Sequence, residues 1–219
     1  MKEMATPEPK DNEVLVRVHA ASINSWDWDL LSGRPGIYRM LSGLIRPRYP
    51  IIGSDVAGVV EKAGSKVKSF RKGDAVFGDL SPAGFGAFAE FVSVDEKWLA
   101  LKPDSISFTQ AASLPQAGVL ALQGLRHRGE LMPGQKVLIN GAGGGVGTIA
   151  LQLAKKAGAM VTCVDSGSKL DMLRRLGADK VIDYAKEDYT RSGKSYDKVV
   201  DVVATRSVRD YKRVLNPGG

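Results

Sequence analysis

The sequence contains little of what several classes of protein require. Its 219 residues include a single cysteine, Cys163, which excludes an internal disulfide framework. No apolar run approaches the roughly 20 residues of a membrane-spanning helix, and the polar stretch Met1 to Asn12 lacks the apolar core of a signal peptide. We therefore expect no membrane span and a cytoplasmic location, or an organelle matrix reached through a targeting segment outside these residues.

Histidine is scarce as well. The chain has two, His19 and His127, which lie far apart and in no metal-ligand spacing. A tetrahedral Cys/His zinc site needs its ligands grouped together, and this inventory does not supply them. We expect both histidines to be structural or surface residues, and we expect no zinc and no other metal site.

The charge balance is basic, with 31 Lys and Arg residues against 24 Asp and Glu residues and a formal net charge of +7. The excess fits a solvated surface that leans basic, or a field that attracts a polyanionic ligand such as a dinucleotide. The basic residues are dispersed and are not interleaved with stacking aromatics, so we expect no nucleic acid partner.

Short segments of alternating apolar and polar residues fill the first half of the chain. Glycine turns such as 63–65 and 72–74 separate them. This alternation is typical of half-buried strands, and short strands at such spacing favour a small β-barrel or sandwich. The predicted strands are 13–20, 55–62, 75–78 and 87–94.

Beyond about residue 105 the pattern changes to strands that alternate with helices. Because the strands are largely apolar, they predict a parallel sheet covered on both faces. We count four strands, whereas a complete doubly wound sheet has about six. The predicted strands are 136–140, 160–164, 180–183 and 197–203, and the predicted helices are 109–125, 147–157 and 168–176.

The segment 136–147 combines an apolar strand, a glycine turn and the start of a helix. Such a turn lets the backbone touch a pyrophosphate, and the helix N-terminus offers free N–H groups and the positive end of its dipole. In the dinucleotide pattern the three glycine positions are Ala142, Gly144 and Gly147, and Asp165 ends the following strand. The sequence therefore predicts a dinucleotide site whose turn residues are Ala142, Gly144, Gly145, Val146 and Gly147.

Several longer motifs occur in a fixed order along nearly the whole chain. They are Ala21-Ser-Ile-Asn24 with Asp27, Gly53-Ser-Asp-Val-Ala-Gly58, Val60 to Gly64, Phe70 to Asp74, Gly86-Ala-Phe-Ala-Glu-Phe91, Leu114-Pro115, Gly141 to Gly147 and Leu176-Gly-Ala-Asp-Lys-Val-Ile-Asp-Tyr184. With these motifs the chain resembles the medium-chain dehydrogenase/reductase superfamily, in its zinc-independent, quinone-oxidoreductase-like (zeta-crystallin-like) branch.

The resemblance implies an α/β architecture with two domains. A GroES-like β-barrel catalytic domain would cover residues 1–107, and a Rossmann domain with a doubly wound parallel sheet would cover residues 108–219. Compared with the family, the chain lacks the first strand, the last Rossmann strands and the return to the catalytic domain. We therefore expect it to be truncated at both ends, and we expect the full-length protein to be a homodimer.

The resemblance also implies candidate catalytic residues. Zinc-dependent branches carry a catalytic cysteine where this sequence has Asn24, and a His-Glu pair where it has Ser54-Asp55. Asn24 would then lie beside the nicotinamide end of the cofactor, with turn capping as the alternative. Tyr38 and Tyr49 are candidates to donate a proton or to line the cleft, although each also suits a packing role and solvent can supply the proton.

Two signals about the cofactor conflict. Asp165 ends the second Rossmann strand, where a carboxylate accepts from the ribose hydroxyls of NAD and repels a 2′-phosphate. Lys169 and Tyr184 match the positions that hold the 2′-phosphate in NADPH-dependent quinone reductases, and Ser166 adds a hydroxyl. A lysine pairs naturally with phosphate, although a solvated lysine is the plainer interpretation. We favour NADP(H) over NAD(H).

The function that follows is an NAD(P)H-dependent reductase of a quinone or an α,β-unsaturated carbonyl. Conjugate reduction tolerates the lack of a metal Lewis acid better than simple carbonyl reduction does, because charge spreads over the acceptor. Two alternatives stay open. The chain could be a zinc-free alcohol dehydrogenase, or a non-enzymatic family member that binds the cofactor, as a crystallin-like or vesicle-associated protein.

Overall fold

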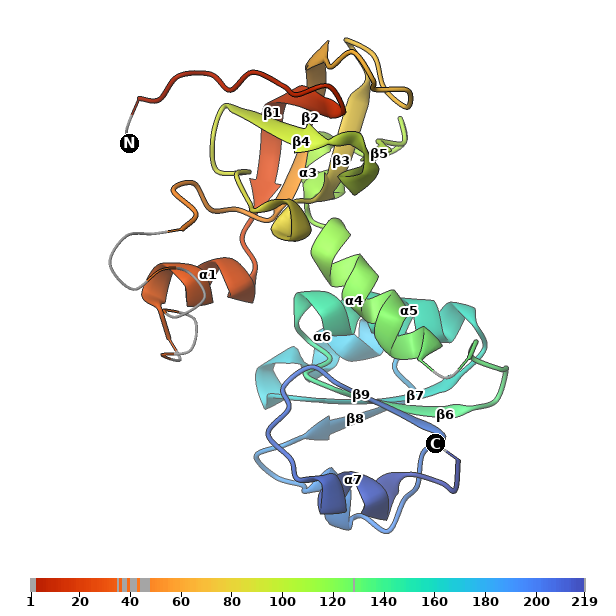
Figure 1. Cartoon of the computed structure of the whole chain (residues 1–219). Coiled ribbons are helices and arrows are strands. Elements are labelled where there is room, and N and C mark those ends of the chain that lie inside the picture. Colours follow the sequence, from red (N-terminus) through yellow and green to blue (C-terminus); the bar gives the residue numbers. More distant parts are fainter. Residues whose placement is uncertain are drawn as a thin grey trace. The chain divides into compact units, whose positions relative to one another are not determined.

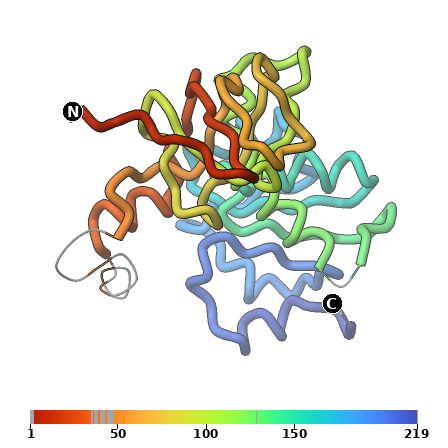
Figure 2. The backbone as a smooth tube through the Cα atoms, turned by 45° about the horizontal axis from the view of Figure 1, so that its top comes forward, coloured from red at the N-terminus to blue at the C-terminus, as the bar shows by residue number. Residues whose placement is uncertain are grey.

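The computed structural model describes residues 3–34, 36, 39, 43, 48–127 and 129–218. The chain divides into two compact units, unit 1 from Met1 to Gln116 and unit 2 from Ala117 to Gly219. The extended segment 3–10, drawn in red in Figure 2, leads into the first strand of unit 1.

Unit 1 is built on a five-stranded antiparallel sheet with the order β4-β1-β2-β3-β5 (Figure 1). Alternate residues such as Val14, Val16, Val56 and Val76 are fully buried and form its core, as the alternation of the sequence predicts. The strands are β1 (Glu13–Ser22), β2 (Asp55–Ala63), β3 (Ala75–Asp79), β4 (Phe91–Asp95) and β5 (Leu99–Leu101), with 3₁₀ turns η1 (Ser81–Ala83) and η2 (Glu96–Trp98).

The helix α1 (Ser25–Ser32) was not predicted from the sequence. Asn24 is its N-cap in an extended conformation, and the Asp27 side chain accepts the Asn24 backbone N–H at 2.8 Å. Gly33 ends the helix in the left-handed region at φ 62°. The helix therefore depends on its caps, because its apolar side chains Trp28 and Leu31 are largely exposed.

The strand predicted at 87–94 is wrong over its first four residues, since β4 begins at Phe91. Ala87 and Phe88 instead donate their backbone N–H groups to Gly53 and Ile52 at 3.0 Å, outside any strand ladder. The predicted helix 109–125 is also two helices, α3 (Phe108–Ala112) and α4 (Pro115–Arg126). Proline has no N–H and a fixed φ, so Pro115 starts a new helix where it would interrupt a continuous one.

Helix α3 packs on β1 and β2, and unit 1 accordingly extends to Gln116. The expected domain boundary between residues 107 and 108 stays a prediction. It lies ahead of α3, nine residues before the point where the two compact units meet.

Unit 2 is a four-stranded parallel sheet with the order β8-β7-β6-β9. The chain steps outward from β6 to β7 and β8 and then returns to the other side of β6, which is the doubly wound arrangement that the sequence predicts. The strands are β6 (Lys136–Asn140), β7 (Met160–Asp165), β8 (Lys180–Asp183) and β9 (Lys198–Asp201).

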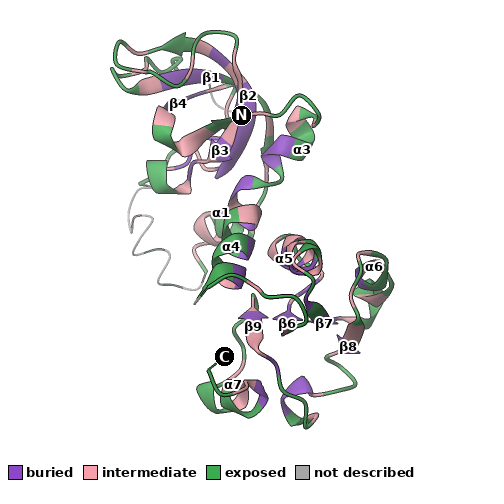
Figure 3. Cartoon of the chain, turned by 90° about the vertical axis from the view of Figure 1, so that its right-hand side faces the viewer, coloured by how far each residue is buried: buried purple, intermediate pink, exposed green. Residues whose placement is uncertain are grey.

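Helices cover both faces of this sheet. Helices α5 (Gly145–Lys156) and α6 (Leu170–Arg175) lie on one face, and α7 (Val208–Val214), which was not predicted, lies on the other (Figures 1 and 3). Val137 and Ile139 point into the core beneath α5, whereas Leu138 belongs to the core on the α7 side. The strands therefore carry apolar residues on both faces, and Figure 3 marks parts of the central strands as buried.

Two further features complete the fold. Cys163 lies on β7, where it is free and fully buried, and burial raises the pKa of its thiol to about 12. The residue is therefore a small core hydrophobe and not a nucleophile. Across the residues whose structure is described, no helix has both the length and the apolar character to cross a membrane.

Candidate dinucleotide-binding site

The glycine turn between β6 and α5 is fastened to the neighbouring strand. Gly141 adopts the left-handed conformation at φ 80°, and the N–H groups of Gly141 and Ala142 both donate to the Val164 carbonyl, at 3.0 and 3.2 Å. Ala142 is fully buried. The small residue at the first pattern position therefore serves the close contact between the turn and β7.

The other two glycine positions of the dinucleotide pattern, Gly144 and Gly147, differ in the space available for a Cβ. A Cβ on Gly147 would lie 2.4 Å from the Gly141 carbonyl oxygen and 2.5 Å from Ala142 Cα, both backbone atoms that cannot give way. A Cβ on Gly144 would meet nothing closer than the Gly141 carbonyl oxygen, at 3.5 Å. Gly147 is thus required by the packing of α5 on the turn, whereas the packing of unit 2 leaves room for a Cβ at Gly144.

The first turn of α5 presents its backbone donors without a cap. Gly144 is the N-cap and has no side chain to accept from them. Gly145, Val146 and Gly147 occupy the first three helical positions, where N–H groups have no partner within the helix. Three donors and the positive end of the helix dipole make this terminus suited to a phosphate or pyrophosphate.

Asp165 at the end of β7 is tied to the turn. Its Oδ2 accepts the Gly143 N–H at 2.7 Å, and its Oδ1 accepts the Ser166 N–H at 2.8 Å. Burial raises the pKa of this carboxyl, but the hydrogen bonds from Ser166 and Gly143 and the ammonium of Lys169 outweigh burial and hold the pKa below its usual range. A carboxylate that is ionised at neutral pH therefore stands at the strand end where a ribose binds in doubly wound sheets.

Lys169, Ser166 and Tyr184 gather around the same strand end. Lys169 Nζ lies 3.4 Å from Asp165 Oδ1, and Ser166 Oγ lies 3.2 Å from Ser168 Oγ. The Tyr184 backbone N–H donates to the Asp165 carbonyl at 3.2 Å, while its side chain is exposed. All the residues predicted to recognise the adenosine end of a dinucleotide thus lie at the carboxyl edge of β7 and β8.

A polar network at β9 was missed by the sequence reasoning. Asp201 accepts from Asn140 Nδ2 at 3.1 Å and from the Tyr211 hydroxyl at 2.7 Å, and also from the N–H groups of Val203 and Ala204, each at 2.8 Å. The network fixes the loop after β9 beside the glycine turn, because a Cβ on Gly141 would meet Val203 Cγ2 at 2.8 Å. The sequence signal that could have predicted this network is that Asn140 and Asp201 are polar residues at the ends of two apolar parallel strands.

In unit 1 the structure brings Asn24 against the adjacent pair Ser54 and Asp55, which lies far from it in the sequence. Asn24 Nδ2 donates to Ser54 Oγ at 3.0 Å and to Asp55 Oδ2 at 2.9 Å. Asp55 also accepts from the Ser22 hydroxyl at 3.1 Å and from the Gln116 N–H at 3.0 Å. Both N–H groups of the Asn24 amide are therefore used within unit 1.

Asp55 is completely buried. Burial raises its pKa to about 6, the hydrogen bonds from Asn24, Gln116 and Ser22 partly offset that rise, and the negative charge of Asp79 adds to it. The carboxylate is thus a buried acid that accepts three hydrogen bonds, from Ser22, Asn24 and Gln116, and that forms no salt bridge with the residues whose structure is described.

The two tyrosines considered for proton transfer have different outcomes. Tyr38 lies outside the described residues. Tyr49 packs edge-on against Phe85, with ring centroids 5.0 Å apart, which fits a packing role. His19 likewise stacks on Phe108 at 4.5 Å, as a structural histidine does.

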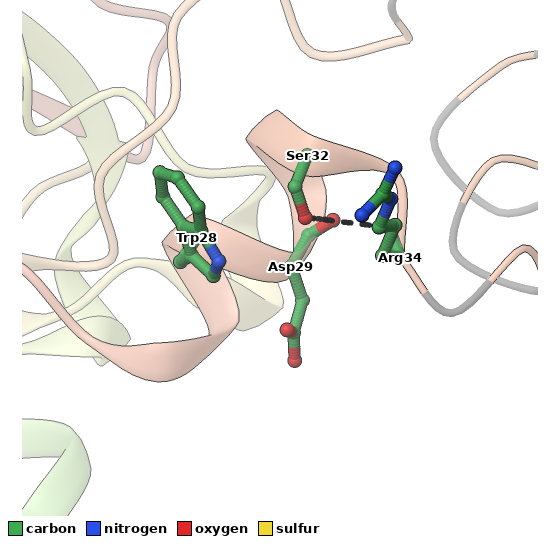
Figure 4. Close-up of a pocket in the computed structure, with 4 residues that line it drawn as sticks. All are labelled: Trp28, Asp29, Ser32 and Arg34. Atoms are coloured by element: carbon green, nitrogen blue, oxygen red, sulfur yellow. Dashed lines mark hydrogen bonds between the residues drawn. The ribbon is translucent and has the colours of Figure 1, made fainter.

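A surface hollow of about 470 Å³ lies along α1, lined by Trp28, Asp29, Ser32 and Arg34 (Figure 4). Ser32 Oγ donates to the Asp29 carbonyl at 3.4 Å and accepts the Arg34 N–H at 3.3 Å. These bonds finish the C-terminal turn of the helix. None of the predicted site residues whose structure is described lines this hollow, and we assign it no role.

Comparison with known proteins supplies the family. A family model for the alcohol dehydrogenase GroES-like domain matches residues 10–104, and a model for zinc-binding dehydrogenases matches residues 145–219. Together they span most of unit 1 and most of unit 2. The chain belongs to the medium-chain dehydrogenase/reductase superfamily.

Individual relatives agree with this assignment. The chain is 40% identical over 208 residues to the NADPH-dependent alkenal/one oxidoreductase, chloroplastic, of Arabidopsis thaliana, covering 91% of this chain and 52% of that protein. The solved quinone oxidoreductase from Coxiella burnetii is 36% identical with a TM-score of 0.83, covering 91% of this chain and 62% of that one. The Escherichia coli quinone oxidoreductase complexed with NADPH is 33% identical with a TM-score of 0.74, covering 85% and 55%. The chain spans about half the length of the curated relatives it matches.

One family model carries zinc in its description, so the superfamily raises the question of a metal. The matched segment 145–219 contains no histidine, and its one cysteine is buried in the core of unit 2. In unit 1 the Asn24 amide beside Asp55 already donates to the Ser54 hydroxyl and to the Asp55 carboxylate. Among the described residues no three His, Cys, Asp or Glu side chains are grouped so as to hold a metal ion. The donor set does not fit the Cys/His chemistry of zinc.

Asp55→Asn tests how the buried carboxylate of unit 1 responds to pH. The folded-state pKa of about 6 lies above the usual 3.8, so folding takes up a proton between these values and the wild type loses stability as the pH rises through them. The Asn variant takes up no such proton. Relative to wild type, its free energy of unfolding should therefore increase from about pH 4 to about pH 6 and then stay level.

Denaturant unfolding at a series of pH values measures this difference. The amide also loses one acceptor atom, which changes stability by the same amount at every pH and leaves the slope to be read. A difference between the two proteins that is constant from pH 4 to pH 6 would show that Asp55 does not titrate there.

Proposed function

We propose that this chain is the larger part of an NADPH-dependent oxidoreductase that reduces a quinone or an α,β-unsaturated carbonyl compound. The observation that carries the proposal is the uncapped N-terminus of α5, with open space at Gly144, next to the ion pair of Lys169 and Asp165. The relatives named as a quinone oxidoreductase and as an NADPH-dependent alkenal/one oxidoreductase support it.

We propose the following arrangement of the cofactor along the turn and the two strand edges. The pyrophosphate would accept from the N–H groups of Gly145, Val146 and Gly147. Asp165, Ser166, Lys169 and Tyr184 would hold the adenosine ribose with its 2′-phosphate. In a doubly wound sheet the ligand crosses the point where the strand order reverses, so the nicotinamide half would extend toward β9, where Asp201 fixes the loop of Val202 and Val203.

NADPH is favoured over NADH on the electrostatics of the β7 edge. The Asp165 carboxylate already accepts two backbone N–H groups, and the ammonium of Lys169 lies beside it. Its charge is therefore largely compensated, and its repulsion of a 2′-phosphate is correspondingly weak. Lys169 is half-exposed and can donate a charge-assisted hydrogen bond to that phosphate.

A reduced nicotinamide, when bound, supplies the hydride, and the acceptor takes up a proton to complete a two-electron reduction. The chain's own task is to orient the ring and keep water from it. We propose that Asn24 lies beside the nicotinamide end, as the family resemblance implies. Because both its N–H groups are used by Ser54 and Asp55, Asn24 would shape the pocket rather than donate a proton, and solvent or Tyr38 would supply one.

Gly144→Val tests the cofactor assignment. The added side chain would occupy the space through which the pyrophosphate reaches the α5 donors, so binding of both NADPH and NADH, measured by fluorescence titration, should be lost. The melting temperature should change little, because a Cβ at this position meets only an ordinary contact. Gly147→Ala is the matched comparison and should destabilise unit 2 by about 1–3 kcal/mol through overpacking. Unchanged nucleotide affinity in the Val variant would refute the site.

Lys169→Met tests the choice of NADPH. The variant keeps the aliphatic stem and removes the charge, so the free energy of NADPH binding should weaken by roughly 1–3 kcal/mol, the scale of one charge-assisted hydrogen bond. NADH has no group at that place, and its affinity should stay within about a factor of two. A wild type that prefers NADH, together with a variant that changes neither affinity, would make Asp165 the determinant and the cofactor NAD(H).

We also propose that the reaction does not use zinc, on the donor set of unit 1. Metal analysis of the purified protein should find no stoichiometric zinc, and a chelator should leave quinone reduction unchanged. A firmly held equivalent of zinc, lost together with activity on chelation, would place the protein in a zinc-dependent branch. The expected homodimer and cytoplasmic location stay predictions about the full-length protein.

A further inference from the structure

Gly143 occupies a position that the dinucleotide pattern leaves free, between Ala142 and Gly144. Its φ does not lie in the left-handed region, so the backbone itself does not require glycine there. A Cβ on Gly143 would nevertheless lie 2.5 Å from Lys169 Cδ and 3.0 Å from Asp165 Oδ2. The missing side chain thus leaves room for two side chains of the cofactor-recognition cluster.

The three residues form a closed arrangement. The Lys169 stem lies across the bare Cα of Gly143, its ammonium lies 3.4 Å from Asp165 Oδ1, and Asp165 Oδ2 accepts the Gly143 N–H at 2.7 Å. The Asp165 side chain is 9% exposed and the Lys169 side chain 46% exposed. Lys169 can therefore turn toward an incoming anion, whereas Asp165 is held beneath it.

Two carboxylates lie at the carboxyl ends of β7 and β8, so the binding of an anion there depends on where the Lys169 ammonium lies. Asp183 pairs with Asp165 in the register of β7 and β8, and a Cβ on Gly167 would meet its Oδ2 at 2.7 Å. Two carboxylates thus stand at neighbouring strand ends, around the loop where the ribose would bind. A 2′-phosphate placed here meets two negative charges unless the ammonium of Lys169 stands between them.

We propose that Gly143 is a specificity-determining residue, whose bare Cα seats the Lys169 stem across the turn so that its ammonium compensates Asp165 and faces the 2′-phosphate. This rests on the proposed function. A methyl group at position 143 displaces Lys169 from the turn and leaves the carboxylate uncompensated. NADPH affinity then falls, and NADH affinity, which involves no phosphate at this place, is retained.

A double-mutant cycle tests this. Dissociation constants for NADPH and NADH are measured for wild type, Gly143→Ala, Lys169→Met and the double variant. Gly143→Ala should lower the preference for NADPH over NADH on the order of tenfold, and should have no further effect on that preference when Lys169 is already Met, because the two residues act as one unit. Gly145→Ala, whose Cβ would meet only Ala117 at 3.6 Å, should change both affinities together and leave their ratio unaltered.

The outcomes separate this proposal from the function on which it rests. Wild type that binds neither nucleotide overturns both. If wild type binds NADPH but Gly143→Ala leaves the preference for NADPH over NADH unchanged or higher, only the role of Gly143 is overturned. The same follows if Gly143→Ala lowers that preference equally in the Lys169→Met background. Should Gly143→Ala fail to fold, Gly143→Ala with Lys169→Ala removes the stem that the methyl meets. Recovery of the fold supports the contact, and failure to recover overturns it.

Discussion

The hydrogen bond from the Gly143 N–H to Asp165 is the interaction on which the candidate site depends. A carboxylate at the end of a buried strand is costly unless it is paired, and this one is paired to the glycine turn, to its own loop and to Lys169. The same contacts hold the turn against β7, so that α5 begins in one defined place. Cofactor recognition and the geometry of the sheet edge are therefore products of one small network.

The glycines of this turn have separate physical causes. At Gly147 a side chain would clash with backbone atoms of the turn. At Gly141 it would require a left-handed φ and would clash with Val203. At Gly143 it would clash with the side chains of Lys169 and Asp165. At Gly144 nothing in unit 2 opposes a Cβ closely. A glycine that the fold does not require is the residue at which a bound pyrophosphate would come nearest to the backbone.

The buried carboxyl of unit 1, Asp55, has a different environment from Asp165. Asp165 is surrounded by N–H donors and a lysine and stays ionised, whereas Asp55 is held by neutral donors and has its pKa raised to about 6. In the zinc-dependent relatives considered above, the same region is expected to hold a metal. Here an amide, hydroxyls and one carboxylate are hydrogen-bonded to one another, a donor set that does not fit the Cys/His chemistry of zinc.

The sequence by itself determined the type of each unit, because alternation with period two and the strand-turn-helix order of 136–147 follow from local burial. Asp165 was predicted to end its strand, and Lys169 and Tyr184 were assigned to the same site from the family resemblance. Helix α1, whose support is an Asn24–Asp27 cap and not an apolar stripe, was missed, and α3 was joined to α4 across Pro115. The contacts of Gly143 with Lys169, the network of Asp201 with Asn140 and Tyr211, and the cluster around Asp55 were decided by the tertiary structure alone. Each joins residues from different segments, and the direction of a side chain across a gap is fixed by packing and not by sequence spacing.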